Sequence, residues 1–310
     1  MNKHPRPCRA GFTLVELLVV IGIIALLISI LLPSLNAARA QAKKVACAAS
    51  LRELSNAMHI YAAEWDDYVP YGHIDQAAFN YVINFNNTVP TSAVARTSLG
   101  LLYEAGLMPS GKAFYCPEEV DPLYVHDNRD VGANGEPINP WIFEDPNLAD
   151  WLDTPPASGN RHVRIGYGAR PDTNWIQAVE IGNARPGIPE RPFEDIAATA
   201  SGNPVRAFPR MSELSGKSIL ADLFFNPGVV ERRHGDGNNV AFSDGSVRYI
   251  PLGAFDNEEV VPAATLAVWE GLAPTAFPGV ALNYVFLYEN NSSNAAFGDS
   301  QGLWLAFDKY

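Results

Sequence analysis

The longest hydrophobic run in the chain extends from Phe12 to Leu32 and contains one charged residue, Glu16. As a helix, these 21 residues would be roughly 31 Å long, enough to cross the hydrocarbon core of a bilayer. The segment before the run contains no acidic residue and three basic ones: Lys3, Arg6 and Arg9. The positive-inside rule therefore predicts a single-pass span, residues 12–33, with its N-terminus in the cytoplasm and the C-terminal part across the membrane.

A second pattern follows Pro33 and continues to about Glu64. Apolar residues recur there at spacings of three and four, which predicts that residues 34–65 form an amphipathic continuation of the helix. Its apolar stripe, on which a globular domain would pack, consists of Leu35, Ala38, Ala42, Val45, Ala49, Leu51, Leu54, Met58 and Tyr61. Pro33 is the expected position of a kink, or of a break that begins a separate short helix.

Residues 66–310 lack a long periodic stretch and are expected to form a globular head. The local patterns predict helices and strands separated by the loop-rich stretches 118–161 and 171–209. Helices are expected at 98–105 and 263–272, and strands at 114–117, 164–168, 217–225, 239–243, 246–250, 280–288 and 303–307. The adjacent Asp66 and Asp67 suggest a turn at the helix end rather than a metal site. The expected fold class is α+β, with the long helix packed on an antiparallel sheet.

The start of the hydrophobic run allows three interpretations. The first is a secretory signal peptide cleaved near residues 34–38, and the second is a plain signal anchor. Neither explains why Gly11 stands directly before Phe12, or why an acidic residue stands at Glu16 inside an apolar span, where a carboxylate is costly and usually functional. The sequence GFTLVEL, residues 11–17, resembles the N-terminus of type IV prepilins and type II secretion pseudopilins.

The resemblance implies a processing step and a mode of assembly. Residues 1–11 would be a leader that a prepilin peptidase removes by cleavage between Gly11 and Phe12, followed by methylation of the Phe12 amine. Glu16, fifth in the mature chain, would pair with the Phe12 amine of a neighbouring subunit. It also implies a pilin-like fold and an inner-membrane location, with other pilin or pseudopilin subunits as partners.

The charge balance fits an exported protein. Without the three basic residues of the leader, the chain has 19 basic and 34 acidic residues, a net charge of −15. This acidity argues against nucleic acid as a partner, because phosphate binding needs a basic face. Of the three cysteines, Cys8 lies in the leader, so Cys47 and Cys116 either form one disulfide or stay free, and their spacing does not decide which.

A hairpin is predicted near the C-terminus, at residues 234–245. Asp244 and Gly245 stand between two short apolar segments, which favours a two-residue turn with positive φ at both positions. His234 precedes Asp244 by ten residues, and the pair resembles the His-x9-Asp-Gly element of a large pseudopilin-like family that is abundant in planctomycetes. That family often has a histidine after the glycine, whereas this chain has Ser246.

Three roles are open for this element. His234 and Asp244 could act as a general acid–base pair, or could hold the hairpin to its sheet through side-chain hydrogen bonds. Asp236 and Asn238 have the alternate-oxygen spacing of calcium loops, and Asp222 or Asp244 could complete a Ca²⁺ site. Asp222, inside a predicted strand, is either the polar step of an edge strand or a site carboxylate. No other cofactor is expected.

The expected function is that of a non-enzymatic pseudopilin or minor pilin-like subunit, with its head in the periplasm or at the cell surface. One alternative is a membrane-anchored binding module that presents a glycan or protein site through Trp141, Trp151 and Trp175. The other is a membrane-tethered hydrolase that uses His234 and Asp244.

Overall fold

The structure is a computed structural model of the chain. It describes residues 14–70, 73–74, 77–78, 82–86, 95–96, 99–117, 119, 121–132, 137–141, 143–144, 161–170, 210–224, 227–256 and 304–310. The chain divides into two compact units, Met1–Lys43 and Lys44–Tyr310. The predicted helix at 263–272, the predicted strand at 280–288 and the loop-rich stretch 171–209 lie outside the described residues.

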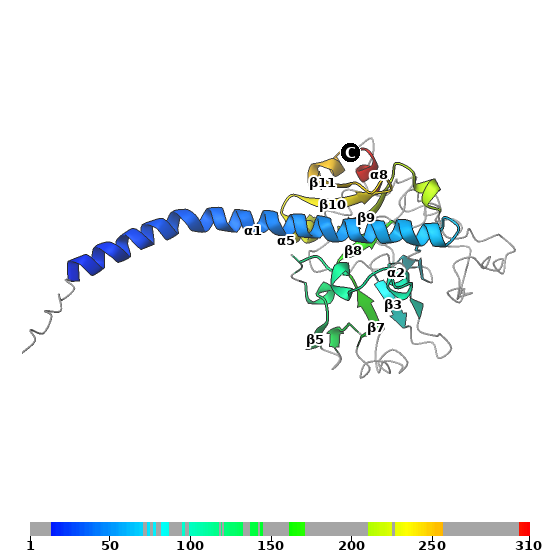
Figure 1. Ribbon diagram of the computed structural model, residues 1–310, viewed down its shortest axis with the longest axis horizontal. Coiled ribbons are helices and arrows are strands. Elements are labelled where there is room, and N and C mark those ends of the chain that lie inside the picture. The colour runs from blue at the N-terminus through cyan, green and yellow to red at the C-terminus, as the bar shows by residue number, and fades with distance from the viewer. Residues whose placement is uncertain are drawn as a thin grey trace, which may run out of the picture. The chain divides into compact units, whose positions relative to one another are not determined.

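A single helix, α1, extends from Leu14 to Glu64 (Figure 1). Pro33 lies inside it, so the alternative of a separate helix after a break at Pro33 is wrong. The helix ends at Asp66 and Asp67, which both have positive φ, and the backbone N–H of Asp67 donates to the carbonyl of Ala62. Asp67 Oδ2 also accepts a hydrogen bond from the N–H of Ser212. The two acidic residues therefore form a helix-end turn, as predicted.

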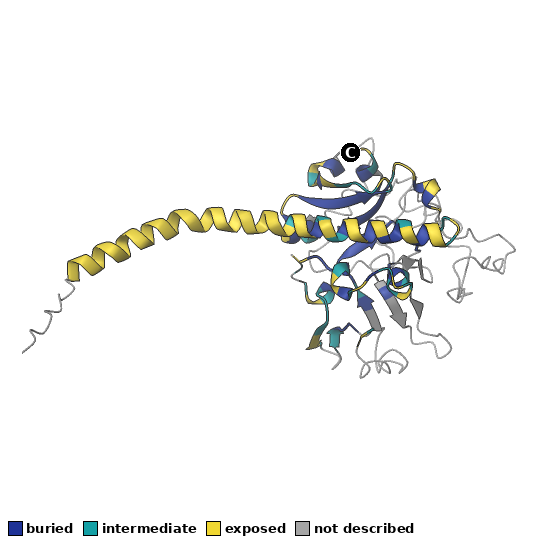
Figure 2. Cartoon of the chain, in the orientation of Figure 1, coloured by how far each residue is buried: buried dark blue, intermediate teal, exposed yellow. Residues whose placement is uncertain are grey.

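Burial along α1 begins later than the sequence pattern indicates (Figure 2). The first buried residue is Cys47, and Leu51, Leu54, Met58 and Tyr61 are buried as predicted. The other members of the predicted stripe are exposed instead: Leu35, Ala38, Ala42 and Val45 before Cys47, and Ala49 after it. Helical spacing shows which residues share a face but not where a partner lies, and core packing against this face starts at Cys47.

The main sheet of the head has four antiparallel strands. They are β8 (Tyr167–Ala169), β9 (Ser218–Asp222), β10 (Gly237–Phe242) and β11 (Val247–Pro251), in the order β11-β10-β9-β8. The predicted strands at 217–225, 239–243 and 246–250 are thereby confirmed. All five residues of β9 are buried and the strand is central, so the edge-strand interpretation of Asp222 is wrong.

The other strands form smaller antiparallel sheets. In one, β3 (Val82–Asn86) lies between β4 (Ala95–Arg96) and β7 (Arg161–Arg164). Two hairpins pair β1 (His73–Ile74) with β2 (Ala77–Ala78) and β5 (Asn128–Val131) with β6 (Pro137–Asn139). The predicted strand at 164–168 is divided between β7 and β8, which belong to different sheets. The stretch 118–161 thus contains structure of its own.

Short helices complete the head. They are α2 (Gly100–Glu104), η1 (Gly111–Phe114), η2 (Pro122–Tyr124), η4 (Met211–Leu214), α5 (Pro227–His234), η5 (Leu252–Asp256) and α8 (Trp304–Asp308). The helix predicted at 98–105 is confirmed by α2. The strand predicted at 114–117 is wrong, because Phe114 ends a 3₁₀ helix whose first turn is capped by the Ser110 side chain.

The predicted strand at 303–307 is also wrong, because these residues form α8. Trp304 and Phe307 are fully buried and contact the rings of Phe224 and Phe255. A five-residue apolar run has no period long enough to separate strand from helix, so these aromatic contacts determine the conformation. The fold class is α+β with antiparallel sheets and a long N-terminal apolar helix.

Candidate functional site

The first candidate site is the N-terminal part of α1. Gly11 and Phe12 lie outside the described residues, and Glu16 is exposed in the first turn of the helix. Large apolar side chains from Leu14 to Leu32 expose between 46% and 77% of their surface, so this part of the helix has no core of its own. A window of the helix with mean hydropathy 3.1 is long and apolar enough to span a membrane.

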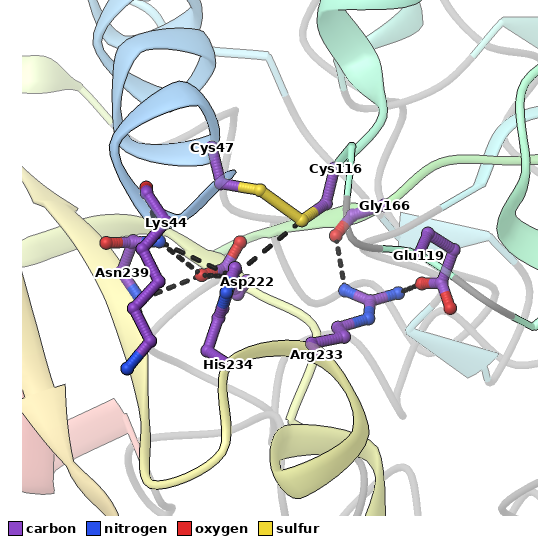
Figure 3. The surroundings of a disulfide bond; sticks show 9 residues. All are labelled: Lys44, Cys47, Cys116, Glu119, Gly166, Asp222, Arg233, His234 and Asn239. Atoms are coloured by element: carbon purple, nitrogen blue, oxygen red, sulfur yellow. Dashed lines mark hydrogen bonds and ion pairs between the residues drawn. A yellow bond between two sulfur atoms is a disulfide. The ribbon is translucent and has the colours of Figure 1, made fainter. Parts of the chain in front are cut away.

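The second candidate site is a buried cluster around a disulfide between Cys47 of α1 and Cys116 (Figure 3). His234 Nε2 lies 3.7 Å from Cys116 Sγ and 2.8 Å from Asp222 Oδ2. One donor atom from each of the four residues lies within 4.8 Å of the others, and all four residues are buried. Sequence spacing had left the pairing of the two cysteines open, and the structure joins them.

The position of His234 follows from the local sequence. His234 is the last residue of α5, and Gly235, with φ +85°, stops the helix by adopting the left-handed conformation that favours glycine. The N–H of Gly235 donates to the carbonyl of Glu231, which satisfies one of the terminal carbonyls of the helix. The stop leaves the imidazole of His234 fully buried against β9 and next to the disulfide.

Asp222 lies at the end of β9, and Asn239 of β10 holds its carboxylate. The backbone N–H and the side-chain amide of Asn239 both donate to Asp222 Oδ2, at 2.8 and 3.0 Å. Asp222 Oδ1 is buried and accepts no hydrogen bond from the described residues. Tyr167 stands opposite Asp222 on β8, and burial raises the pKa of its hydroxyl, with the carboxylate adding to the effect. The carboxylate is therefore fixed at one oxygen, and the other lacks a donor.

A buried ion pair adjoins the cluster. The guanidinium of Arg233 pairs with the Glu119 carboxylate and donates to the Gly166 carbonyl at 2.8 Å (Figure 3). Burial lowers the pKa of Arg233 to about 9, which still leaves the side chain charged at neutral pH. An unpaired buried charge is costly. The Glu119 carboxylate and the Gly166 carbonyl offset this cost and allow the charged Arg233 side chain to be buried beside His234.

The structure does not bring His234 and Asp244 together. The Asp244 side chain is exposed, accepts a hydrogen bond from the Ser246 N–H at 2.8 Å, and lies near Arg248. Hydrogen bonding to Ser246 holds the pKa of Asp244 below its usual value. The carboxylate next to His234 is that of Asp222, and it links His234 to the sheet through a side-chain contact. The side chains of His234 and Asp222 are both fully buried.

The turn at Asp244 and Gly245 also differs from the two-residue turn that was predicted. Gly245 has φ +79°, but Asp244 does not have positive φ. The N–H of Gly245 donates to the carbonyl of Phe242, and the N–H of Phe242 donates to the carbonyl of Ser246. This is the pattern of a three-residue loop in which a left-handed glycine follows a type I turn. The hairpin is confirmed, and only its turn type is wrong.

The residues considered for calcium have separate environments. Asp236 Oδ1 accepts hydrogen bonds from Lys44 Nζ at 3.1 Å and from the Tyr249 hydroxyl at 2.5 Å. These contacts hold the pKa of Asp236 below its usual value, the tyrosine contributing most. Asp222 is engaged by His234 and Asn239 instead. The Asn238 side chain is buried without a hydrogen-bond partner among the described residues.

Trp141 does not lie on the surface. It is 2% exposed and contacts a group of rings that consists of Tyr103, Phe114, Tyr115, His126 and Phe143. Burial also lowers the pKa of His126 in this group. Trp141 therefore belongs to the core rather than to a ligand-binding surface, and Trp151 and Trp175 lie outside the described residues.

The sequence does not reveal the cluster as a unit. Its members, Cys47, Cys116, Asp222 and His234, come from four different segments, and no spacing rule connects them. Asn239 and Glu119 carry no motif. The one signal that could have suggested the cluster is that both cysteines of the mature chain occur in or next to predicted apolar elements, where thiols become buried.

Comparison with known proteins gives a match at the N-terminal end of the chain. Residues 6–32 match the family model for the prokaryotic N-terminal methylation motif. No curated protein and no solved structure matches the chain. Proteins with this prepilin-type motif are structural subunits, and the motif and the apolar helix together fit anchoring in a membrane. The chain thus begins with a prepilin-type N-terminal methylation motif, which indicates a processed, pilin-like protein.

Proposed function

We propose that the protein is a pseudopilin or minor pilin-like subunit that assembles into a type II secretion or type IV pilus-like filament. The observation that carries this proposal is the match of residues 6–32 to the methylation motif at the start of an exposed apolar helix. A prepilin peptidase would cleave between Gly11 and Phe12 and methylate the Phe12 amine. The leader, residues 1–11, would remain in the cytoplasm, and the head would face the periplasm or the cell surface.

The apolar surface of α1 is suited to association with other helices in a membrane. Its large exposed side chains, apart from one, are aliphatic, so in water they would carry a large hydrophobic penalty that lipid or a neighbouring helix removes. Glu16 is the exception, and a carboxylate at that depth needs a positive partner. The Phe12 amine of a neighbouring subunit would supply that charge and set the offset between helices.

The test of processing is the mass of the chain. The full-length protein would be produced with its own prepilin peptidase, extracted from membranes and analysed by intact mass and N-terminal sequencing. We expect a chain that begins at methylated Phe12. A chain that begins at Met1 would leave a plain signal anchor, and one that begins after Ser34 would mean an ordinary exported protein. A variant with Gly11→Val, which adds bulk at the scissile bond, should stay uncleaved.

Assembly is tested separately, with substitutions at Glu16. Glu16→Gln keeps the size of the side chain and removes its charge, whereas Glu16→Ala removes both. Both variants should still be processed, and both should fail to co-purify with the filament subunits in crosslinked membranes. If Glu16→Gln assembles as well as the natural chain, charge pairing does not set the helix register.

A further inference from the structure

The strongest unexplained feature of the head is the chemistry of the cluster around the disulfide. Two sulfur atoms, an imidazole nitrogen and a carboxylate oxygen meet within 4.8 Å in a fully buried setting. Among the described residues, Cys47, Cys116, Asp222 and His234 form the group whose potential metal-ligand atoms lie this close together. Cysteine, histidine and aspartate are the residues that bind Zn²⁺, and four protein ligands are typical of a closed structural zinc site.

The distances are close to those of a tetrahedral site. With Zn–S bonds of about 2.3 Å and Zn–N bonds of about 2.0 Å, neighbouring ligand atoms are roughly 3.3–3.8 Å apart. His234 Nε2 is already 3.7 Å from Cys116 Sγ, and its separation of 2.8 Å from Asp222 Oδ2 would widen slightly. Reduction of the disulfide lets the sulfur atoms separate to the distance that a metal requires.

The surroundings of Asp222 add an independent observation. Oδ2 is oriented by two hydrogen bonds from Asn239, which is the second-shell arrangement that commonly fixes a metal-binding carboxylate. Oδ1 is buried and has no hydrogen-bond donor among the described residues. A buried carboxylate oxygen without a donor is costly, and a cation bound to this carboxylate would offset that cost.

We propose that the reduced cluster binds one Zn²⁺ ion through the sulfurs of Cys47 and Cys116, His234 Nε2 and an oxygen of Asp222. Binding releases the protons of the two thiols. Oxidation then forms the Cys47–Cys116 bond by exchange with the disulfide of a thiol–disulfide oxidoreductase. The two electrons reduce that disulfide, whose sulfurs take up two protons, and Zn²⁺ leaves with its charge unchanged.

The consequence is that the same two cysteines can link the segments of the head in two alternative ways, through a metal ion or through a disulfide. A newly translocated, reduced chain would be held by the metal, and the oxidised chain is held by the disulfide. The metal and the disulfide each link α1 to the segment that follows η1. In the metal-bound form, His234 and Asp222 would also tie the β9–β10 region to this link. This inference does not depend on filament assembly.

The experiment compares reduced and oxidised full-length protein in detergent micelles. The reduced form, stripped of metal by a chelator that is then removed, should bind one equivalent of Zn²⁺, and the oxidised form none. With Co²⁺ as a probe, the reduced form should show intense visible bands of tetrahedral cobalt and a sulfur-to-cobalt charge-transfer band. Oxidised glutathione should then release one equivalent of metal to a chromogenic chelator.

Variants identify the ligands. Asp222→Asn and His234→Gln should abolish tight 1:1 binding, and Asn239→Ala should weaken it by roughly 10–100-fold through loss of an outer-shell hydrogen bond. Asp236→Asn and Asp244→Asn alter carboxylates of the same region outside the cluster and should bind as the natural chain does. Near-UV circular dichroism would confirm that each variant is folded.

The comparison of Zn²⁺ binding by the reduced and the oxidised natural chain tests the proposal even if a variant fails to fold, because the two redox forms have the same sequence. The proposal is overturned if the reduced, natural chain binds no Zn²⁺. It is also overturned if the oxidised chain binds equally well, or if folded Asp222→Asn and His234→Gln keep the natural affinity. A reduced chain that unfolds without metal and refolds with one equivalent of Zn²⁺ supports it.

Discussion

Two buried arginines each join segments that are far apart in the sequence. Arg170 forms a two-pronged ion pair with Asp308 of α8 and also donates to Ser218, at 2.9 Å in each case. Arg233 connects α5 to Glu119 and to the Gly166 carbonyl. Burial lowers the pKa of both guanidinium groups. Each charge is tolerated because acceptors surround it, and the two arginines therefore connect distant segments of the head.

Removing one partner of the buried Arg233–Glu119 ion pair should strongly destabilise the fold. Arg233→Met leaves the Glu119 carboxylate buried beside an apolar chain, so the free energy of unfolding should fall by about 3–5 kcal/mol. Urea denaturation of the full-length protein in detergent micelles would measure the loss. The double variant Arg233→Met/Glu119→Met removes both charges and should recover most of it. The single Glu119→Met variant completes the cycle, and if the losses of the two single variants simply add in the double variant, the ion pair contributes no coupling energy.

Asp236 allows a direct test of electrostatics at the surface. The Tyr249 hydroxyl and the Lys44 ammonium stabilise its carboxylate, so its pKa lies below the usual 3.8. A lowered pKa in the folded state means that the contribution to stability is present above the usual pKa and is lost as the pH falls through the lowered value. Tyr249→Phe should raise the pKa of Asp236 toward 3.8 in an NMR titration. An unchanged pKa would show that the tyrosine is not the main cause.

At the scale of elements, the disulfide connects α1 to the segment after η1. The two cysteines are 69 residues apart, and closing a loop of this length in the unfolded chain should stabilise the fold by about 2–4 kcal/mol. The double variant Cys47→Ala/Cys116→Ala should lose that amount in denaturation experiments with a chelator present. The natural chain under reducing conditions, also with chelator, is the matched control and should show a similar loss.

The β10–β11 hairpin depends on the conformation of one turn residue. Gly245 has φ +79°, a value that strains residues with a Cβ atom, so Gly245→Ala should destabilise the head by about 1 kcal/mol. Gly245→Asn should cost less, because asparagine adopts left-handed φ more readily. Thermal unfolding and hydrogen exchange at the Phe242 amide would measure both effects. Equal losses from the two variants would mean that the left-handed φ of Gly245 does not determine the cost.

What the sequence predicts correctly is mostly local. The strands around Asp244 and Gly245 follow from alternation and a turn pair that are contiguous in sequence, and α1 follows from its period. The convergence of Cys47 and His234 depends on packing between distant elements, which no local rule encodes. The α8 helix lies where the sequence pattern predicts a strand, because its five residues gain their conformation from ring contacts with Phe224 and Phe255.

At the scale of the whole molecule, the exposed apolar part of α1 determines how the protein partitions. We expect it in the membrane fraction after washes with high salt and alkaline carbonate, and in the supernatant after detergent. Ile24→Lys places a charge within the span, at a cost of about 2.5–3.5 kcal/mol at a helix centre, and should lower the integrated fraction. Exposed Lys43→Ala is the control and should not. Release of the natural chain by carbonate would contradict a membrane span.

The Cys47–Cys116 link also has a mechanical meaning. A pull applied between the N-terminal helix and the C-terminus reaches Cys47 and passes through the covalent bond to Cys116. The residues between the two cysteines form a closed loop that carries no tension. Their contour length, roughly 230 Å, therefore cannot be extended by the pull. Reduction would restore that length, so in single-molecule stretching the oxidised head should behave as the shorter and more force-resistant tether.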